Sequence, residues 1–386
     1  MKKLILLAAV LVSALAANAK VWRVNPNEAA RADFLSVTDA CNAMKVTRGD
    51  TLYCEPGSYQ GTQTISKPQL TLLGPGWEIP TNFGSTSTIA TASFTDILSV
   101  NSDSTYVAGI WASKILLNSA TSINHITIER CMFGQIYVNS AYNDYNHTLK
   151  NLTIRNNFIS SKLYDGDDPI SLIYFGSILN VSIENNIIVN YNETETNNNC
   201  TAAIVLRAGN VLNTTGLIAH NTIITRNNSN YSYDSYAIEA YYTTIRDNII
   251  INRLTKNNLN ESVLLVYAMM STCEFYNNVL SITAENVTAD FQNYFPNNSY
   301  IGATLANTFT RTIEGGAAET YFRLKEGSVA AAKAYQGEDC GAYAGAYPFI
   351  VNGRPRGVPY IYDVTAPNYP ENDVLNISFK VKANNQ

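Results

Sequence analysis

Acidic and tyrosine side chains gather in polar segments that recur through the middle of the chain. The segments span residues 161–169, 191–200, 227–235 and 253–261. Tyrosine rings stack on the C–H faces of sugars, and hydroxyls and carboxylates hydrogen-bond to sugar hydroxyls. We therefore predict a glycan-binding surface, with an ordinary solvated loop edge as the alternative. Its candidate ligand-binding residues are Tyr164, Asp165, Asp167, Asp168, Tyr191, Glu193, Tyr231, Tyr233 and Asp234.

Catalysis at such a surface would need further groups. A polysaccharide lyase needs a base and a cation that neutralises a uronate carboxylate, and Lys162, Arg207 and His220 are the candidates. Paired carboxylates also suit the general acid and base of a glycoside hydrolase. For His220 the alternative is structural, with the ring filling a slot in a stack of side chains.

One acidic turn has the composition of a cation site. Asp165-Gly166-Asp167-Asp168 offers several carboxylate oxygens, and calcium prefers oxygen ligands. Its spacing departs from that of an EF-hand loop, so an ordinary acidic turn is the alternative. Calcium is the one cofactor that the sequence suggests, and no other metal site is predicted.

A repeated pattern must position the polar segments. It reads Ile-Arg-Asn-Asn-Phe-Ile at 154–159, and related stretches place their fourth residue at 131, 157, 186, 221, 248 and 278. Steps of 26 to 35 residues indicate stacked repeats. β-Branched residues favour strands, and asparagine tolerates the left-handed conformation of a sharp turn. We therefore predict an all-β parallel β-helix with one coil per repeat.

Alternation along each strand assigns the side chains to columns. The isoleucine at the first position points inward, and the second position points outward, where Glu129, Arg155 and Glu184 alternate in sign. We expect an inward polar ladder at the third position, from Arg130, Asn156, Asn185, His220, Asp247 and Asn277. The left-handed turn is expected at the fourth, from Cys131, Asn157, Asn186, Asn221, Asn248 and Asn278.

The N-terminus has the form of a secretory signal peptide. Met1-Lys2-Lys3 precedes an apolar run from Leu4 to Ala17, and Ala17-Asn18-Ala19 suits cleavage before Lys20. The run is shorter than a membrane helix requires, and no later segment is long and apolar enough. We expect a bacterial protein that is secreted, periplasmic or on the cell surface. The net charge of −5 and the lack of Lys/Arg clusters argue against a nucleic-acid partner.

The six cysteines are widely spaced and include no Cys-x-x-Cys pair. That spacing argues against a structural zinc site. Export permits disulfides, and Cys41–Cys54 is the candidate bridge. The alternative is that both are small buried residues.

The chain divides into a signal peptide (1–19), an N-terminal cap with the first coils (20–76), β-helix coils (77–345) and a C-terminal segment (346–386). Gly49 to Tyr59 and Leu70 to Gly76, followed by the Asn-Asn repeats, resemble the opening of pectin-lyase-like right-handed β-helix proteins. The resemblance covers residues 20–345 and implies a right-handed coil. The family's galacturonan-hydrolase and pectate-lyase signatures are missing as sets, so it implies no particular activity.

The C-terminal part is predicted to close the coil. Residues 321–346 resemble the closing coil of the same proteins, and residues 374–381 alternate strictly as a strand does. We expect this strand to pack on the coils as a cap, with a strand offered to a partner as the alternative.

Three functions are compatible with these features. The first is a non-catalytic exported protein, expected to be a monomer, that binds extracellular glycan or surface partners through the loop edge. The second is a lyase or hydrolase that acts on an acidic polysaccharide. The third is a structural component of a surface assembly.

Overall fold

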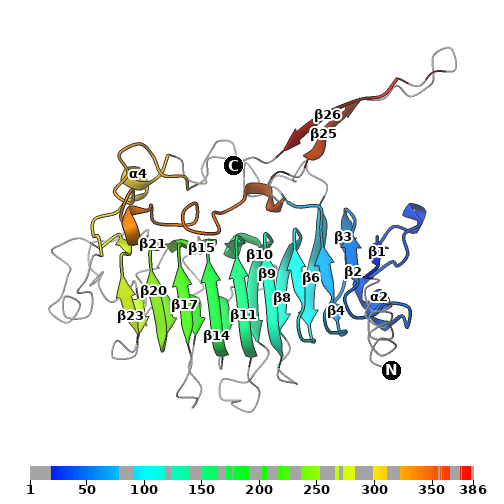
Figure 1. Ribbon diagram of the computed structural model, residues 1–386, viewed down its shortest axis with the longest axis horizontal. Coiled ribbons are helices and arrows are strands. Elements are labelled where there is room, and N and C mark those ends of the chain that lie inside the picture. Colours follow the sequence, from blue (N-terminus) through cyan, green and yellow to red (C-terminus); the bar gives the residue numbers. More distant parts are fainter. Residues whose placement is uncertain are drawn as a thin grey trace, which may run out of the picture.

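The computed structural model shows a stack of coils with a long C-terminal segment laid along it (Figure 1). It describes residues 19–77, 91–117, 123–138, 149–163, 171–175, 178–190, 202–206, 215–225, 236–252, 266–268, 273–282, 299–310, 322–354, 357, 359–365, 374 and 376–383. The predicted signal peptide therefore lies outside the described residues, apart from Ala19.

One face of the stack is a parallel sheet, sheet A, to which each coil contributes one strand. Its order is the order of the sequence, and each strand pairs in parallel with the next. The strands are β1 (Val21–Val24), β2 (Thr51–Cys54), β5 (Thr71–Leu73), β7 (Tyr106–Ala108), β9 (Asn124–Glu129), β11 (Leu149–Arg155), β14 (Ile178–Glu184), β17 (Gly216–Ala219), β20 (Thr243–Arg246) and β23 (Glu274–Tyr276).

A second parallel sheet forms the rest of each coil. It begins with β3 (Gly57–Tyr59), β4 (Gln63–Ile65), β6 (Ala92–Val100), β8 (Trp111–Leu117) and β10 (Met132–Val138), and then divides into two rows. Row B holds β12 (Phe158–Ser160), β15 (Ile187–Asn190), β18 (Thr222–Thr225), β21 (Ile249–Asn252) and β24 (Val279–Leu280). Row C holds β13 (Ser171–Phe175), β16 (Ala202–Leu206), β19 (Tyr236–Ala240) and β22 (Val266–Ala268).

This topology confirms the predicted all-β, right-handed parallel β-helix. The first-position isoleucines Ile128, Ile154, Ile183, Ile218 and Ile245 are fully buried, and they are neighbours across sheet A. Stacked β-branched residues thus form the core that the repeat predicts.

The two polar columns are interchanged relative to the prediction. The left-handed residues are those of the third position, with φ from 52° to 59°. A left-handed residue turns the chain and breaks the two-residue alternation. The fourth position therefore points inward, and the third lies on the outside of the corner between sheet A and row B. The outward residues are Arg130, Asn156, Asn185, His220, Asp247 and Asn277.

The inward asparagines form the amide ladder. Asn157, Asn186, Asn221 and Asn248 each donate from Nδ2 to Oδ1 of the asparagine one coil further on, at 2.9–3.0 Å. Each Nδ2 also donates to a backbone carbonyl of the preceding coil, as Asn186 does to Ile154 O at 2.9 Å. The side chains are fully buried, so the ladder satisfies backbone groups that water cannot reach.

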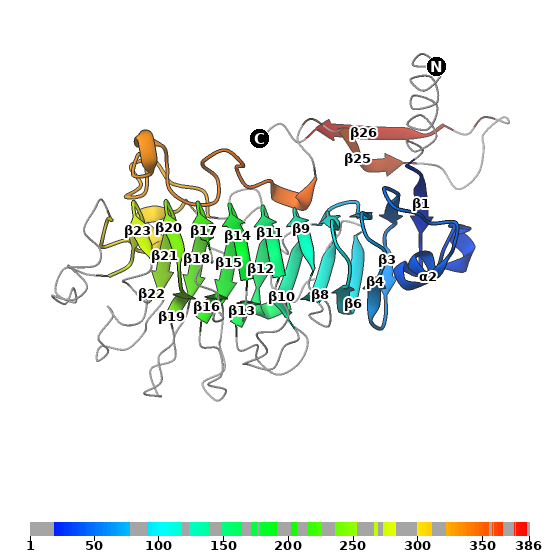
Figure 2. The same cartoon turned by 60° about the horizontal axis from the view of Figure 1, so that its bottom comes forward.

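The C-terminal segment 322–354, called the strap, runs back along this corner in the opposite direction to the coils (Figures 1 and 2). Cys340 Sγ donates to Asn277 O, Asn185 Nδ2 donates to Ala342 O, and Asn156 Nδ2 donates to Tyr347 O. Its apolar residues, including Phe322 and Phe349, pack on the outward side chains of row B. The prediction of a closing coil at 321–346 is thus corrected, because the segment binds along the coils instead of extending the stack.

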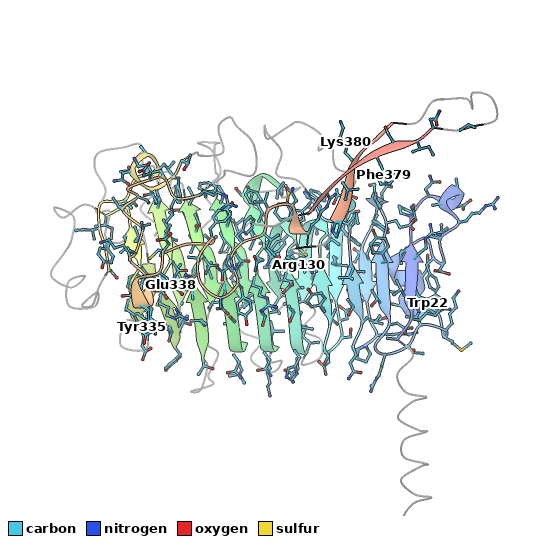
Figure 3. The ribbon with its side chains drawn as sticks, turned by 45° about the horizontal axis from the view of Figure 1, so that its top comes forward. Trp22, Arg130, Tyr335, Glu338, Phe379 and Lys380 are labelled. Carbon is cyan, nitrogen blue, oxygen red and sulfur yellow. The ribbon has the colours of Figure 1, made fainter. Side chains whose placement is uncertain are left out.

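The C-terminal strand is present as β26 (Ser378–Ala383), and it pairs antiparallel with β25 (Pro359–Thr365). Ile377, Phe379 and Val381 are each more than half exposed, and Phe379 and Lys380 stand away from the coils (Figure 3). Within the described residues, β26 pairs with β25 and not with a strand of the coils. The expectation that it packs on the coils is therefore corrected to a projecting hairpin.

The N-terminal cap carries the two cysteines of the predicted bridge. Cys41, in α2 (Val37–Asn42), and Cys54, at the end of β2, are buried free thiols. The structure thus corresponds to the alternative of small buried residues. Burial raises the pKa of both thiols above its ordinary value.

The ladder makes a testable contribution to stability. Asn186→Ala removes two hydrogen bonds donated by its amide and leaves the N–H groups of Asn157 without their acceptor. We expect a loss of about 3–5 kcal/mol in the free energy of unfolding, measured by urea denaturation. Thr153→Val, on the outside of the same region, should change it by under about 0.5 kcal/mol. A loss below about 1 kcal/mol for Asn186→Ala would contradict this account.

Candidate ligand-binding site

The loop-edge residues predicted to bind glycan lie outside the described residues. The acidic turn 165–168 proposed for calcium and the candidate Arg207 also lie outside the described residues. Lys162 is described, and it belongs to the short 3-10 turn η2 (Ser161–Leu163). The prediction of a shared loop edge stays a prediction. It concerns Tyr164, Asp165, Asp167, Asp168, Tyr191, Glu193, Tyr231, Tyr233 and Asp234.

His220 is described, and its surroundings favour the structural alternative. It is 6% exposed, Gly345 of the strap lies against its ring, and its Nε2 is 3.6 Å from Asp247 Oδ2. Burial lowers the pKa of His220, against the opposing effect of Asp247. The strap therefore shields this histidine from a polymeric substrate. It lies outside the inward ladder because it is the left-handed residue of its coil.

A charged cluster that the sequence did not identify as a candidate binding site lies on the outer face of sheet A. Glu129, at the end of β9, accepts hydrogen bonds from Tyr106 Oη at 2.6 Å, Arg130 Nε at 3.0 Å and Arg155 Nε at 2.6 Å. Arg130 Nη2 also donates to Tyr106 Oη at 2.9 Å. One carboxylate thus fixes two guanidinium groups on neighbouring coils.

The cluster keeps its charged states despite its burial. Burial acts to raise the pKa of Glu129, but the hydrogen bonds from Tyr106, Arg155 and Arg130 outweigh it and lower that pKa. Burial and the bond to Glu129 raise the pKa of Tyr106 to about 12, so the phenol is neutral near pH 7. Two positive charges therefore stand against one negative charge. Glu184, the register partner of Arg155, instead accepts from Ser182 Oγ.

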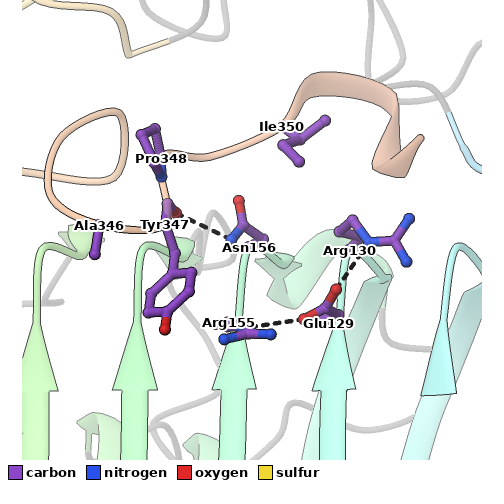
Figure 4. A pocket seen from close by; sticks show the side chains of 8 residues that line it. All are labelled: Glu129, Arg130, Arg155, Asn156, Ala346, Tyr347, Pro348 and Ile350. Atoms are coloured by element: carbon purple, nitrogen blue, oxygen red, sulfur yellow. Dashed lines mark hydrogen bonds and ion pairs between the residues drawn. The ribbon is translucent and has the colours of Figure 1, made fainter. Parts of the chain in front are cut away.

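The strap turns this cluster into a pocket. Tyr347, Pro348 and Ile350 face Glu129, Arg130, Arg155 and Asn156 across a cavity of about 330 Å³, called here the cationic pocket (Figure 4). The Arg155 guanidinium lies 4.4 Å from the Tyr347 ring centroid, and Arg130 Nη1 donates to Gly353 O at 3.3 Å. Cation–π and hydrogen-bond contacts thus hold both arginines in place.

One polar group of the pocket remains available to a ligand, and a second is unpartnered but buried. Arg155 uses Nε for Glu129, and its Nη atoms have no hydrogen-bond acceptor among the described residues. Asn156 donates to the strap, while its Oδ1 is buried without a partner there. A planar guanidinium with open Nη atoms presents the fork that binds a carboxylate bidentately.

A second cavity lies on the same face of sheet A, closer to the N-terminal ends of the strands. This hollow of about 510 Å³, called here the polar hollow, extends over β9, β11, β14 and β17. Its polar lining includes the exposed His125, whose Nε2 is 3.4 Å from Asn151 Nδ2. Thr153 and Asn151 of the lining share strand β11 with Arg155.

Part of the cationic pocket was visible in the sequence. The outward column placed Glu129 beside Arg155, and that ion pair forms. The signal that was missing is the strap, because residues 346–350 meet the coils from almost 200 positions away, as between Asn156 and Tyr347. No periodicity connects such segments.

Neither a cluster of metal-binding side chains nor a membrane-spanning helix is found in the described part of the chain. It contains no group of three or more His, Cys, Asp or Glu side chains placed to hold a metal ion. It also holds no helix whose length and apolar character would let it cross a bilayer.

Comparisons with known proteins yield structural likenesses alone. No protein-family model and no curated protein sequence matches the chain. The pectate lyase Pel9A aligns with a TM-score of 0.46 at 16% identity, over 84% of this chain and 96% of the lyase. An alginate lyase from Paenibacillus sp. str. FPU-7 aligns with a TM-score of 0.32 at 14% identity, over 66% and 99%. The parallel β-helix fold of the chain rests on its own sheet topology.

The cluster predicts a defined pH dependence of stability. Because the folded-state pKa of Glu129 lies below its ordinary 4.5, its contribution is complete above about pH 4.5 and is lost as the pH falls through the lower folded-state value. Glu129→Gln should therefore cost about 3 kcal/mol at pH 7 and progressively less in acid. Urea denaturation of both proteins across this range measures the difference. A cost that does not vary with pH would refute the assignment.

Proposed function

We propose that this protein binds an acidic polysaccharide, with a uronate carboxylate seated on Arg155 in the cationic pocket. The observation that carries the proposal is the pair of fixed guanidinium groups with one carboxylate between them, with the Nη atoms of Arg155 open to the cavity. A fixed arginine loses little side-chain entropy when it binds a carboxylate.

Features around the pocket favour a sugar over a small inorganic anion. The Tyr347 ring is 46% exposed beside Arg155 and can stack on a sugar's C–H face. The predicted signal peptide would deliver the protein to a compartment where such polymers occur.

The geometry supports binding better than elimination. A lyase needs its base within hydrogen-bond reach of the sugar whose carboxylate is neutralised. The described histidine on this face is His125, which lies opposite Asn151 on the neighbouring strand. Asn151 precedes Arg155 by four residues, so His125 is about 13 Å from Arg155 along the strand direction. Tyr106, with its raised pKa, is neutral and a poor base. The lyase interpretation therefore depends on Lys162 or Arg207, and stays a prediction.

The first test of this proposal is the loss of a single guanidinium. Arg155→Gln should weaken binding of an oligogalacturonate at least tenfold by isothermal titration calorimetry, because a charged hydrogen bond contributes about 1.5–3 kcal/mol. Arg155→Lys keeps the charge but loses the forked pair of donors, so its affinity should lie between those of the wild-type and Arg155→Gln proteins. Arg48→Gln, the same charge change on the exposed N-terminal cap, is the matched control. Equal affinity of the Arg155→Gln and Arg48→Gln proteins would remove Arg155 from the site.

A second measurement separates binding from cleavage. The protein is incubated with a panel of acidic polysaccharides, and the absorbance of unsaturated uronate products and the number of reducing ends are followed. We expect neither to rise, because Glu129, the one carboxylate among the residues that line the cationic pocket, accepts three hydrogen bonds and its lowered pKa makes it a poor base. Product formation that survives Arg155→Gln would move the function to an enzyme with its centre elsewhere on the chain.

A further inference from the structure

The polar hollow differs from the cationic pocket in its chemistry. Hydroxyl and amide groups dominate its polar lining, and none of its lining residues is Asp, Glu, Lys or Arg. Its volume of about 510 Å³ lies in the range of small-ligand sites. The residues that matter are Thr127, Asn151, Thr153, Asn180, Ser182 and Thr215.

Register sets the hydroxyl groups in a row. Thr153 pairs with Thr127 on one side and Ser182 on the other, so the three lie on adjacent strands at intervals of about 4.8 Å. Thr153 is two residues from Arg155 on β11, which is about 6.6 Å along an extended strand. The row therefore adjoins the cationic pocket on the same face.

A second row of amides is held in a fixed order. Asn180 Nδ2 donates to Asn151 Oδ1 at 3.0 Å, and Asn151 Nδ2 donates to Asn124 Oδ1 at 2.8 Å. Asn151 and Asn180 are both left-handed, with φ of 51° and 56°. The side chains are thus positioned before a ligand arrives, which reduces the entropy lost on binding.

We propose, on the basis of the proposed function, that the polar hollow is a second subsite that takes an uncharged sugar. The ligand is then a heteropolysaccharide in which neutral sugars neighbour the uronate bound at Arg155. Hydroxyl and N-acetyl groups of a neutral sugar exchange hydrogen bonds with the threonine and asparagine rows. A second uronate would place its carboxylate in the hollow, away from the two arginines, and lose hydration without gaining an ion pair.

Three oligosaccharides of equal length test this subsite on the full mature chain. One is all galacturonate, one alternates glucuronate and N-acetylglucosamine, and one is all N-acetylglucosamine. We expect the wild-type protein to bind the alternating probe most tightly by calorimetry. A preference for the all-galacturonate probe would overturn the subsite.

Two variants address the hollow directly. Thr153→Val removes one hydroxyl, and Asn180→Gly removes an amide while keeping a residue that tolerates positive φ. Each should weaken binding of the alternating probe about fivefold, while the affinity for the all-galacturonate probe should stay within about twofold of the wild-type value. Thr244→Val is the control, because Thr244 continues the Thr153–Ser182–Leu217 column beyond the hollow.

The outcomes separate the two proposals. If Arg155→Gln abolishes galacturonate binding while Thr153→Val and Asn180→Gly act like the control, the acidic site stands and the neutral subsite fails. If the two hollow variants weaken the alternating and neutral probes while Arg155→Gln changes nothing, the neutral subsite stands and the acidic site fails. Absence of binding to all three probes would overturn both.

Discussion

Everything in this molecule depends on stacked coils staying in register at one corner. There the chain turns through a left-handed residue, and the next side chain, an asparagine, hydrogen-bonds to its counterpart one coil away. Buried amides that leave a partner unsatisfied are costly, so a coil that slipped by one residue would break several bonds at once. The ladder thus fixes the positions of side chains that the sequence separates by about 30 residues.

The same corner determines what the outer surface looks like. Because the left-handed residue breaks the alternation, its side chain faces outward, where Asn156 and Asn185 donate to carbonyls of the strap. Apolar side chains on the outside of row B complete the attachment, so both faces of that row are buried. The strap in turn supplies Tyr347 and Ile350, without which the Glu129–Arg155 pair would lie on an open sheet.

The sequence predicted what is periodic and missed what is not. Spacing of the Asn-Asn pairs was enough to predict the coils and the inward isoleucines, because stacking repeats each contact. The two polar columns were interchanged, since alternation cannot be counted through a left-handed residue such as Asn185. The path of the strap could not be predicted, because contacts such as Arg130 to Gly353 join single residues 223 positions apart. Predicting the cationic pocket would require both the repeated contacts between coils and the single contacts made by the strap. Only the Glu129–Arg155 pair follows from the repeat.

A comparison along the corner explains why a ligand site would arise at Arg155 and not at the other outward arginine of the column. Arg246 lies in the same outward column, four coils beyond Glu129. It hydrogen-bonds to Asp247 of its own coil. Asp247 is fully buried and also accepts from the backbone of Tyr335, so that charge is balanced locally and covered by the strap. The corner residue that follows Arg155 is the neutral Asn156. The carboxylate that Arg155 hydrogen-bonds, that of Glu129, is shared with Arg130. The identity of the left-handed residue in each coil therefore decides whether the arginine before it is neutralised within the protein or remains available to an anionic ligand.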